Sequence, residues 1–151
     1  MADVQRFLQA QEKVYMQALA EIRAGKKAGH WMWFMFPQIQ GLGRSAMAQS
    51  YAIADLEEAQ AYLQNPILAA RLENLVAAVL THSQLSAENI FGATDALKLR
   101  SCMTLFSLAN PDIAMPFLAV LKQKFDAEPC QATLAILGIS PSLFSTLVHS
   151  Q

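Results

Sequence analysis

Charged residues are scarce in this sequence, and neither sign of charge is concentrated in one region. Only 15% of the 151 residues are charged, and the formal net charge is −1. The longest run of basic residues is Lys26-Lys27. A protein that binds duplex nucleic acid needs a basic surface opposite the phosphate backbone. The sequence therefore predicts no duplex nucleic-acid binding.

Long hydrophobic runs are also absent. The longest, Trp31 to Phe36, is far shorter than the roughly 20 apolar residues that cross a bilayer as a helix. Near the N-terminus, Asp3 and Arg6 stand where a secretion signal would have an apolar region. We therefore expect a cytoplasmic protein that neither binds nor crosses a membrane.

Cysteine is rare, and the common catalytic motifs are missing. Cys102 and Cys130 form no C-x-x-C pair and have no histidine at zinc spacing, so we expect two buried thiols and no metal site. The motifs H-E-x-x-H, G-x-S-x-G and G-x-x-x-x-G-K-[ST] do not occur. Glu57 and Glu58 lie side by side instead of across a cleft, unlike the paired carboxylates of glycosidases. The sequence thus identifies no catalytic residue and no cofactor.

What the sequence has in excess is hydrophobic residues that favour helices. The hydrophobic share is 54%, above the roughly 45 to 50% of typical globular proteins. The excess lies mostly in alanine, leucine and methionine, which have high helix propensity. Because the length is typical of one domain, we expect a single all-α domain over residues 1–151, folded as a compact multi-helix bundle.

Apolar periodicity and capping residues predict where the helices lie. The clearest helix begins after Asp3 and ends at Gly25. A very apolar helix, beginning at Thr94 or Asp95 and ending before Asn110, should lie in the middle of the fold. The remaining helices are expected over residues 45–51, 55–63, 66–82, 86–91, 115–125, 129–137 and 141–148.

An aromatic segment near residues 30–37 is short and apolar on both faces. Its periodicity does not distinguish a helix from a strand, and at most a trace of strand is expected over residues 30–39. Either structure would be buried, because a segment without charges is costly to expose. We therefore expect Trp31 and Trp33 to be largely buried.

Residues that could bind a ligand concentrate between His30 and Ser45. The structural interpretation is that the aromatic residues and the histidine are core residues, and that Gly41 and Gly43 permit positive φ. The functional interpretation is an anion site, in which glycine backbone N–H groups, the planar fork of Arg44 and a helix start bind a phosphate. The candidate residues of this block are His30, Trp31, Trp33, Gln38, Gly41, Gly43, Arg44 and Ser45.

Lys98 and Ser101 form a second candidate group on the expected central helix. Together with Asp95 they recur every three residues on a helix that is otherwise too apolar for the surface. A buried lysine needs a partner, which is either Asp95 or a ligand. We expect Lys98 and Arg44 to face one shared polar pocket.

A family signature is recognisable in His30 to Gln38 and in Gly41-Leu42-Gly43, and similarity continues through Ile90-Phe91-Gly92 and Met103 to Phe106. With these residues the chain resembles the bacterial domain-of-unknown-function family 1810, which is often mislabelled calpastatin-like. Calpain inhibitors are long, disordered and repetitive, and this chain is none of these. The resemblance implies a small α-helical domain with no assigned reaction.

A fainter similarity covers the run from Gln64-Asn65-Pro66 through Phe91-Gly92 to Met103. This run resembles the helical ADP-ribose-related family that acts on N-glycosidic bonds. The chain lacks that family's Glu-His pair near an early helix, and no tryptophan precedes Gly92. The similarity therefore transfers no catalytic residue.

Two kinds of function are compatible with these observations. The first is a binding protein or enzyme for a phosphate-bearing small molecule, such as a nucleotide or an ADP-ribose-like compound. The second is a non-catalytic interaction domain that docks another protein or a second copy of the chain as a homo-oligomer, which low charge and abundant methionine favour. A ligand site requires convergent polar groups, here His30, Gln38, Arg44 and Lys98, whereas a docking domain requires an exposed apolar patch.

Overall fold

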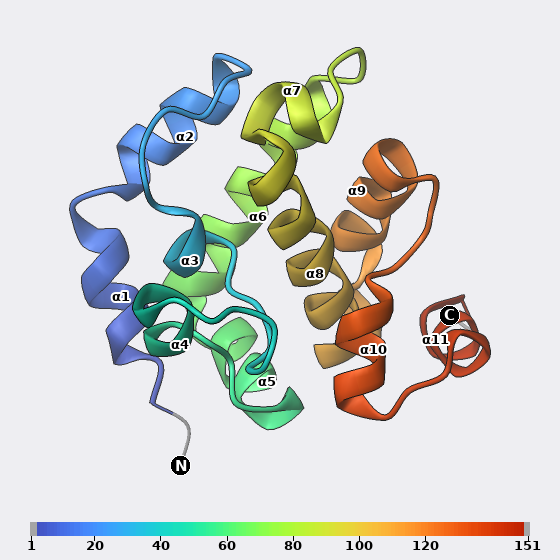
Figure 1. Cartoon of the computed structure of the whole chain (residues 1–151). Coiled ribbons are helices and arrows are strands. Elements are labelled where there is room, and N and C mark those ends of the chain that lie inside the picture. The colour runs from blue at the N-terminus through green and yellow to red at the C-terminus, as the bar shows by residue number, and fades with distance from the viewer. Residues whose placement is uncertain (1–2, 150–151) are drawn as a thin grey trace.

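All regular elements of residues 3–149, which the computed structural model describes, are helices (Figure 1). One isolated parallel β-bridge joins Ile39 to Ile53, so the prediction of an all-α fold with a trace of strand is confirmed. The helices, in chain order, are α1 (Gln5–Glu12), α2 (Tyr15–Arg23), α3 (Met32–Met35), α4 (Ala46–Ser50), α5 (Leu56–Gln64), α6 (Pro66–Thr81), α7 (Ala87–Phe91), α8 (Ala93–Ala109), the 3-10 helix η1 (Pro111–Ile113), α9 (Met115–Phe125), α10 (Gln131–Leu137) and α11 (Pro141–His149).

Local capping explains why several helices begin where the sequence predicts. The side-chain oxygen of Asn65 accepts hydrogen bonds from the backbone N–H groups of Ile67 (3.0 Å) and Leu68 (3.1 Å), and Pro66 is the first residue of α6. Ser86 caps α7 in the same way, within a complete capping box. Such caps satisfy N–H groups that have no partner inside the helix. The predicted starts of these helices are therefore confirmed.

The prediction of one continuous helix over residues 3–25 is wrong in one respect, because this segment forms two helices, α1 and α2, with an interruption at Lys13. Gln11, at the end of α1, is 1% exposed. Its amide nitrogen Nε2 donates to the Phe34 carbonyl oxygen (2.7 Å) and to the Tyr62 hydroxyl oxygen (2.9 Å). The interruption lets α1 pack on α3 while α2 packs on α6.

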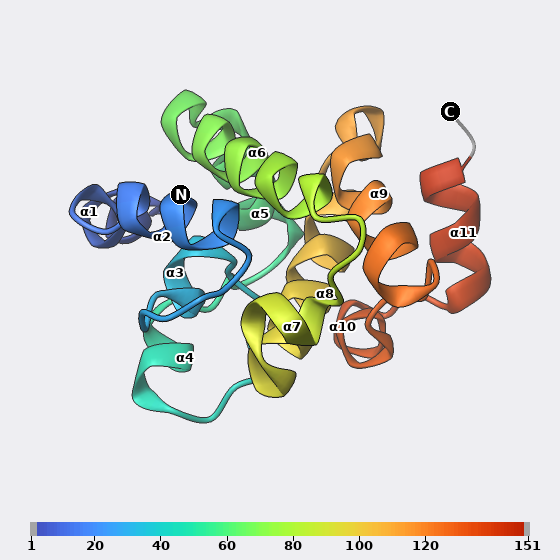
Figure 2. The same cartoon turned by 90° about the horizontal axis from the view of Figure 1, so that it is seen from above.

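Helix α8 passes through the middle of the molecule, as predicted, with α5, α7, α9, α10 and α11 packed around it (Figures 1 and 2). Two of its three buried hydroxyl groups donate to its own backbone, and the third, that of Ser101, bonds to Thr133 of α10. Thr104 Oγ1 donates to the Arg100 carbonyl oxygen (2.8 Å), and Ser107 Oγ donates to the Met103 carbonyl oxygen (2.7 Å). The helix can therefore be buried along most of its length without unpaired polar atoms.

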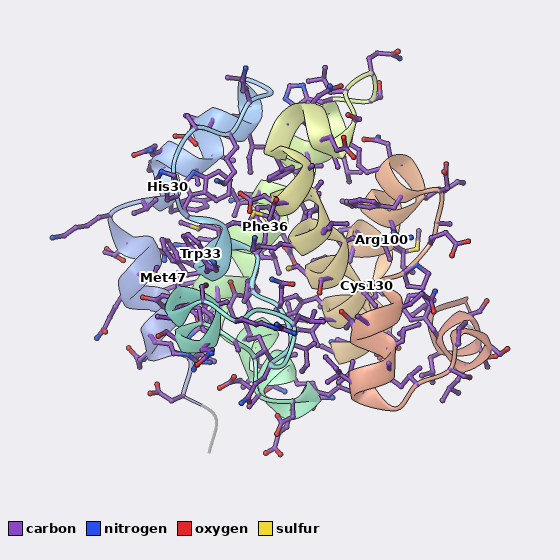
Figure 3. All side chains as sticks on the ribbon, in the orientation of Figure 1. His30, Trp33, Phe36, Met47, Arg100 and Cys130 are labelled. Carbon is purple, nitrogen blue, oxygen red and sulfur yellow. The ribbon has the colours of Figure 1, made fainter. Side chains whose placement is uncertain are left out.

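The aromatic segment forms the short helix α3, which lies against α1. Trp31 is completely buried, whereas Trp33 is only partly buried. Trp31 therefore meets the expectation that both tryptophans are largely buried, and Trp33 is buried less completely. Phe36 faces the centre of the molecule, between α3 and α8 (Figure 3).

The C-terminal corner is made of α10 and α11, which meet at an angle of 91°. Helix α11 buries Phe144 and Val148 and leaves Leu143 and Leu147 exposed. Within residues 3–149, no single helix has the length and hydropathy to span a bilayer. Helices α10 and α11 have the required length and hydropathy only when they are taken together as this bent pair.

Candidate functional site

The loop that leads into α3 is organised by Glu21 of α2. One carboxylate oxygen, Oε1, accepts hydrogen bonds from the backbone nitrogens of Ala28 (2.8 Å) and Gly29 (2.9 Å) and from the indole nitrogen of Trp31 (2.9 Å). His30 is exposed on this loop, at some distance from Arg100 and on the other side of the view (Figure 3). These contacts give Trp31 a structural role, with its only polar atom satisfied.

The glycine turn before α4 is explained by close packing. Gly41 has a φ of +107°, and a Cβ atom on Gly43 would lie 2.3 Å from the Cβ of Ala48 in α4. Ser45 caps α4 by accepting a hydrogen bond from the Ala48 nitrogen (3.1 Å), and the Arg44 side chain is exposed. Because α4 has only five residues, its dipole adds little attraction for an anion.

Lys98 has an internal partner. Its ammonium group donates to Asp95 Oδ1 (3.0 Å), while Lys27 binds Asp95 Oδ2 (2.9 Å) and lies 5.0 Å from the centre of the Trp31 ring. Partial burial alone would raise the pKa of Asp95, but the hydrogen bonds and positive charges of the two lysines lower it below its ordinary value. The structure thus favours the interpretation in which Lys98 pairs with Asp95.

Two of the predicted site residues, Gln38 and Ser101, meet at one pocket of about 400 Å³ between the 38–42 loop, α8 and the start of α10. Neither Arg44 nor Lys98 lines it. We call it the Arg100 pocket. Its lining residues are Gln38, Leu42, Leu97, Arg100, Ser101, Pro129, Cys130, Gln131 and Ala132.

Arg100 is the only charged residue of this pocket, and its side chain is held in place. Its Nε donates to the Glu128 carbonyl oxygen (2.8 Å), and its guanidinium carbon lies 5.5 Å from the centre of the Phe125 ring. Figure 3 shows Arg100 and Cys130 close together where α8, α9 and α10 approach one another. In the part of the chain that the structure describes, no hydrogen bond or ion pair engages the two terminal nitrogens of Arg100.

The other polar groups of the Arg100 pocket are positioned by long-range contacts. The backbone carbonyl of Gln38 accepts a hydrogen bond from the Ile53 nitrogen (2.8 Å), which fixes the backbone of the 38–42 loop. The hydroxyl of Ser101 shares a hydrogen bond with that of Thr133 (2.9 Å). Cys130 is a free thiol that is only half-buried, which corrects the expectation of two buried thiols, because its position at the start of α10 faces the pocket.

Sequence reasoning missed Arg100, although one signal was available. Arg100 is a charged residue next to Ser101 in a helix whose following residues are all buried through Ala109. A cation in such a position needs an explanation, as Lys98 did. Its neighbours Glu128, Phe125 and Cys130 come from a distant segment, which no local pattern connects to α8. Among residues 3–149, no group of three or more histidine, cysteine or carboxylate side chains is arranged to hold a metal ion.

Comparison with known proteins supports the expected family. Residues 1–137 match the family described as "Protein of unknown function (DUF1810)". The conserved hypothetical protein Rv1873 from Mycobacterium tuberculosis has a similar crystal structure, with 46% identity, a TM-score of 0.88, and coverage of 91% of this chain and 98% of that one. No curated protein matches the chain. The fainter similarity to ADP-ribose-related N-glycosidases stays a prediction.

Proposed function

We propose that this chain, which belongs to the DUF1810 family of proteins of unknown function, binds a small molecule with a phosphate group in the Arg100 pocket. The observation that carries the proposal is the guanidinium of Arg100. It is fixed at Nε, and its terminal nitrogens have no partner within residues 3–149. The proposal keeps the ligand class that the sequence suggests and moves the site from Arg44 and Lys98 to Arg100.

A fixed guanidinium is well suited to an anion. Its terminal nitrogens present a planar fork that matches the oxygens of a phosphate group. The Glu128 carbonyl and the Phe125 ring already restrict the side chain, so less conformational entropy is lost when a ligand binds. None of the four ion pairs among the described residues involves Arg100, which leaves its charge available.

The remaining walls of the pocket suit the organic part of such a ligand. Leu42, Leu97 and Pro129 offer apolar surface, and Leu97 is 64% exposed. Gln38 and Gln131 add amide groups that can donate to and accept from hydroxyl groups or a base. The volume of about 400 Å³ lies in the roughly 300 to 1,000 Å³ range of small-molecule sites. A sugar phosphate or a mononucleotide would fit this description.

We propose binding, without a reaction, because the serine hydroxyl of the pocket has no general base beside it. The Ser101 hydroxyl bonds to the Thr133 hydroxyl, which is no general base. Nucleophilic catalysis would require a base within hydrogen-bond reach of the attacking oxygen. The phosphate would therefore be recognised by Arg100 and released unchanged.

Calorimetric titration with ribose 5-phosphate, AMP and ADP-ribose tests the proposal, with ribose and adenosine as phosphate-free controls. We expect binding only of the phosphate-bearing compounds. Arg100→Lys keeps the charge and loses the fork, so it should weaken binding about tenfold, or roughly 1.4 kcal/mol. Arg100→Gln should weaken it further, because it also removes the charge.

Arg44→Gln is the matched control, since Arg44 is an exposed arginine outside the pocket. It should leave binding unchanged. Urea unfolding of each variant shows whether a loss of binding reflects a loss of structure. If Arg44→Gln abolishes binding and Arg100→Gln does not, the site lies at the glycine turn and the proposal is wrong. If none of the phosphates binds, an interaction domain is the better account.

A further inference from the structure

We propose a second binding site, for an aliphatic carboxylate, in the groove between α9 and α11. This groove has a volume of about 400 Å³. It shares no lining residue with the Arg100 pocket. The two proposals are therefore independent, and each can be tested without the other. Figure 2 shows α11 beside α9, and both helices contribute residues to the lining of the groove.

The walls of the groove are almost entirely apolar. Met115, Leu118 and Ala119 line it from α9, and Phe144 lines it from α11. Met115 is 71% exposed, so its flexible side chain can fold over a bound chain. Replacing the water on such an apolar surface with a hydrocarbon chain lowers the free energy of the system.

A single charge lies at the groove, and it is positive. Lys122 is the only charged residue among those that line it, and its side chain is exposed. No ion pair involves Lys122 among residues 3–149. An apolar cleft with one unpaired ammonium group complements a hydrocarbon chain that ends in a carboxylate. This charge distinguishes the proposed ligand from a purely apolar one.

The chain leaves α9 in a way that keeps the groove open. Asp126 (φ 54°) and Ala127 (φ 65°) are both in the left-handed region, which residues other than glycine rarely adopt. The Ala127 nitrogen bonds to the Leu121 carbonyl (2.9 Å), and from residues 126–130 only the small Ala127 lines the groove. This disfavoured backbone conformation turns the chain aside, so that no large side chain fills the space.

The groove is not a feature of the family domain alone. The family match ends at residue 137, whereas Phe144 belongs to α11, which begins at Pro141. One wall of the groove therefore comes from a helix beyond the matched region. We expect the site to depend on this C-terminal helix.

Titration of the full chain with decanoate, decan-1-ol and decyltrimethylammonium, below their micelle concentrations, tests the proposal by calorimetry. We expect one decanoate per chain and at least tenfold weaker binding of the other two. Lys122→Glu should reverse the order of decanoate and decyltrimethylammonium. Ala119→Trp should fill the groove and abolish binding of all three compounds. Lys26→Glu and Ala77→Trp, at exposed positions elsewhere, should change nothing.

Several results would overturn the proposal. One is that Lys122→Glu leaves decanoate binding unchanged, because Lys122 would then play no part in recognising the carboxylate. Another is a failure of decanoate to bind the wild-type chain. A third is a chain that is dimeric by sedimentation, binds no decanoate and becomes monomeric with Lys122→Glu, because the groove would then be a contact between copies. Lys122→Glu changes only an exposed side chain, so the test remains decisive if Ala119→Trp fails to fold.

Discussion

Replacing Glu21 with glutamine is expected to destabilise the protein at neutral pH and to have little effect near pH 2. The carboxylate accepts hydrogen bonds from the backbone nitrogens of Ala28 and Gly29, from the Trp31 indole and from Gln17. Partial burial on its own raises the pKa of Glu21. The four hydrogen bonds outweigh it and lower the pKa from 4.5 to about 2.

The size of the effect follows from this pKa. A shift of one unit corresponds to about 1.4 kcal/mol, but Glu21 is partly exposed, and solvent screening reduces the value. We therefore expect Glu21→Gln to lower the free energy of unfolding by about 1 to 2 kcal/mol at pH 7. Because the folded-state pKa is depressed, this stabilisation is present above pH 4.5 and is lost as the pH falls from about 5 towards 2.

Urea unfolding of the wild type and of Glu21→Gln at pH 7, 5, 4 and 3 measures the difference directly. The gap between the two proteins should shrink as the pH falls. Glu73→Gln is the control, since Glu73 is exposed on α6 and should show no such trend. An equal gap at pH 7 and pH 3, or no gap at pH 7, would refute the role assigned to the carboxylate.

Two further predictions concern stability and are checked by the same urea unfolding. Lys98→Ala should cost only about 1 kcal/mol, because Lys27 still neutralises Asp95. Asp95→Ala should cost more, about 2 to 4 kcal/mol, because it leaves both lysines without a counter-charge; equal costs would contradict the shared ion pair. Ala127→Gly should stabilise the protein by up to about 1 kcal/mol, since glycine adopts a positive φ without strain. A destabilised Ala127→Gly variant would show that the backbone there is unstrained.

The elements that the sequence predicts well are those with local causes. The start of α6 depends on Asn65 and Pro66, which act on residues beside them in the chain. The interruption at Lys13 could not be predicted, because α1 and α2 continue the same apolar spacing. Beside the interruption, the buried amide of Gln11 bonds to Phe34 and Tyr62, which are far away in the sequence. Only the tertiary structure brings them together.

For the same reason, the sequence does not show which of the predicted site residues lie together. Gln38 and Ser101 were selected for their residue types, and they do line one pocket. The sequence leaves Asp95 or a ligand as the partner of Lys98, and no local pattern reveals Lys27, which reaches Asp95 from a different loop. Arg100 was overlooked because its contacts, Glu128 and Phe125, follow it by more than twenty residues.

Most residues of the block from His30 to Ser45 therefore do not line the Arg100 pocket. Their role is to hold the 38–42 loop in place. Near the start of the block, the Trp31 indole donates a hydrogen bond to Glu21. Near its end, Gly43 allows the turn to pack closely against Ala48 of α4. Between these two points, the Ile53 nitrogen holds the carbonyl of Gln38, so the loop is fixed where it meets α8. A substitution such as Gly43→Ala is expected to act on the Arg100 pocket indirectly, by moving the 38–42 loop, whereas Arg100→Gln removes the guanidinium that we propose as the binding group.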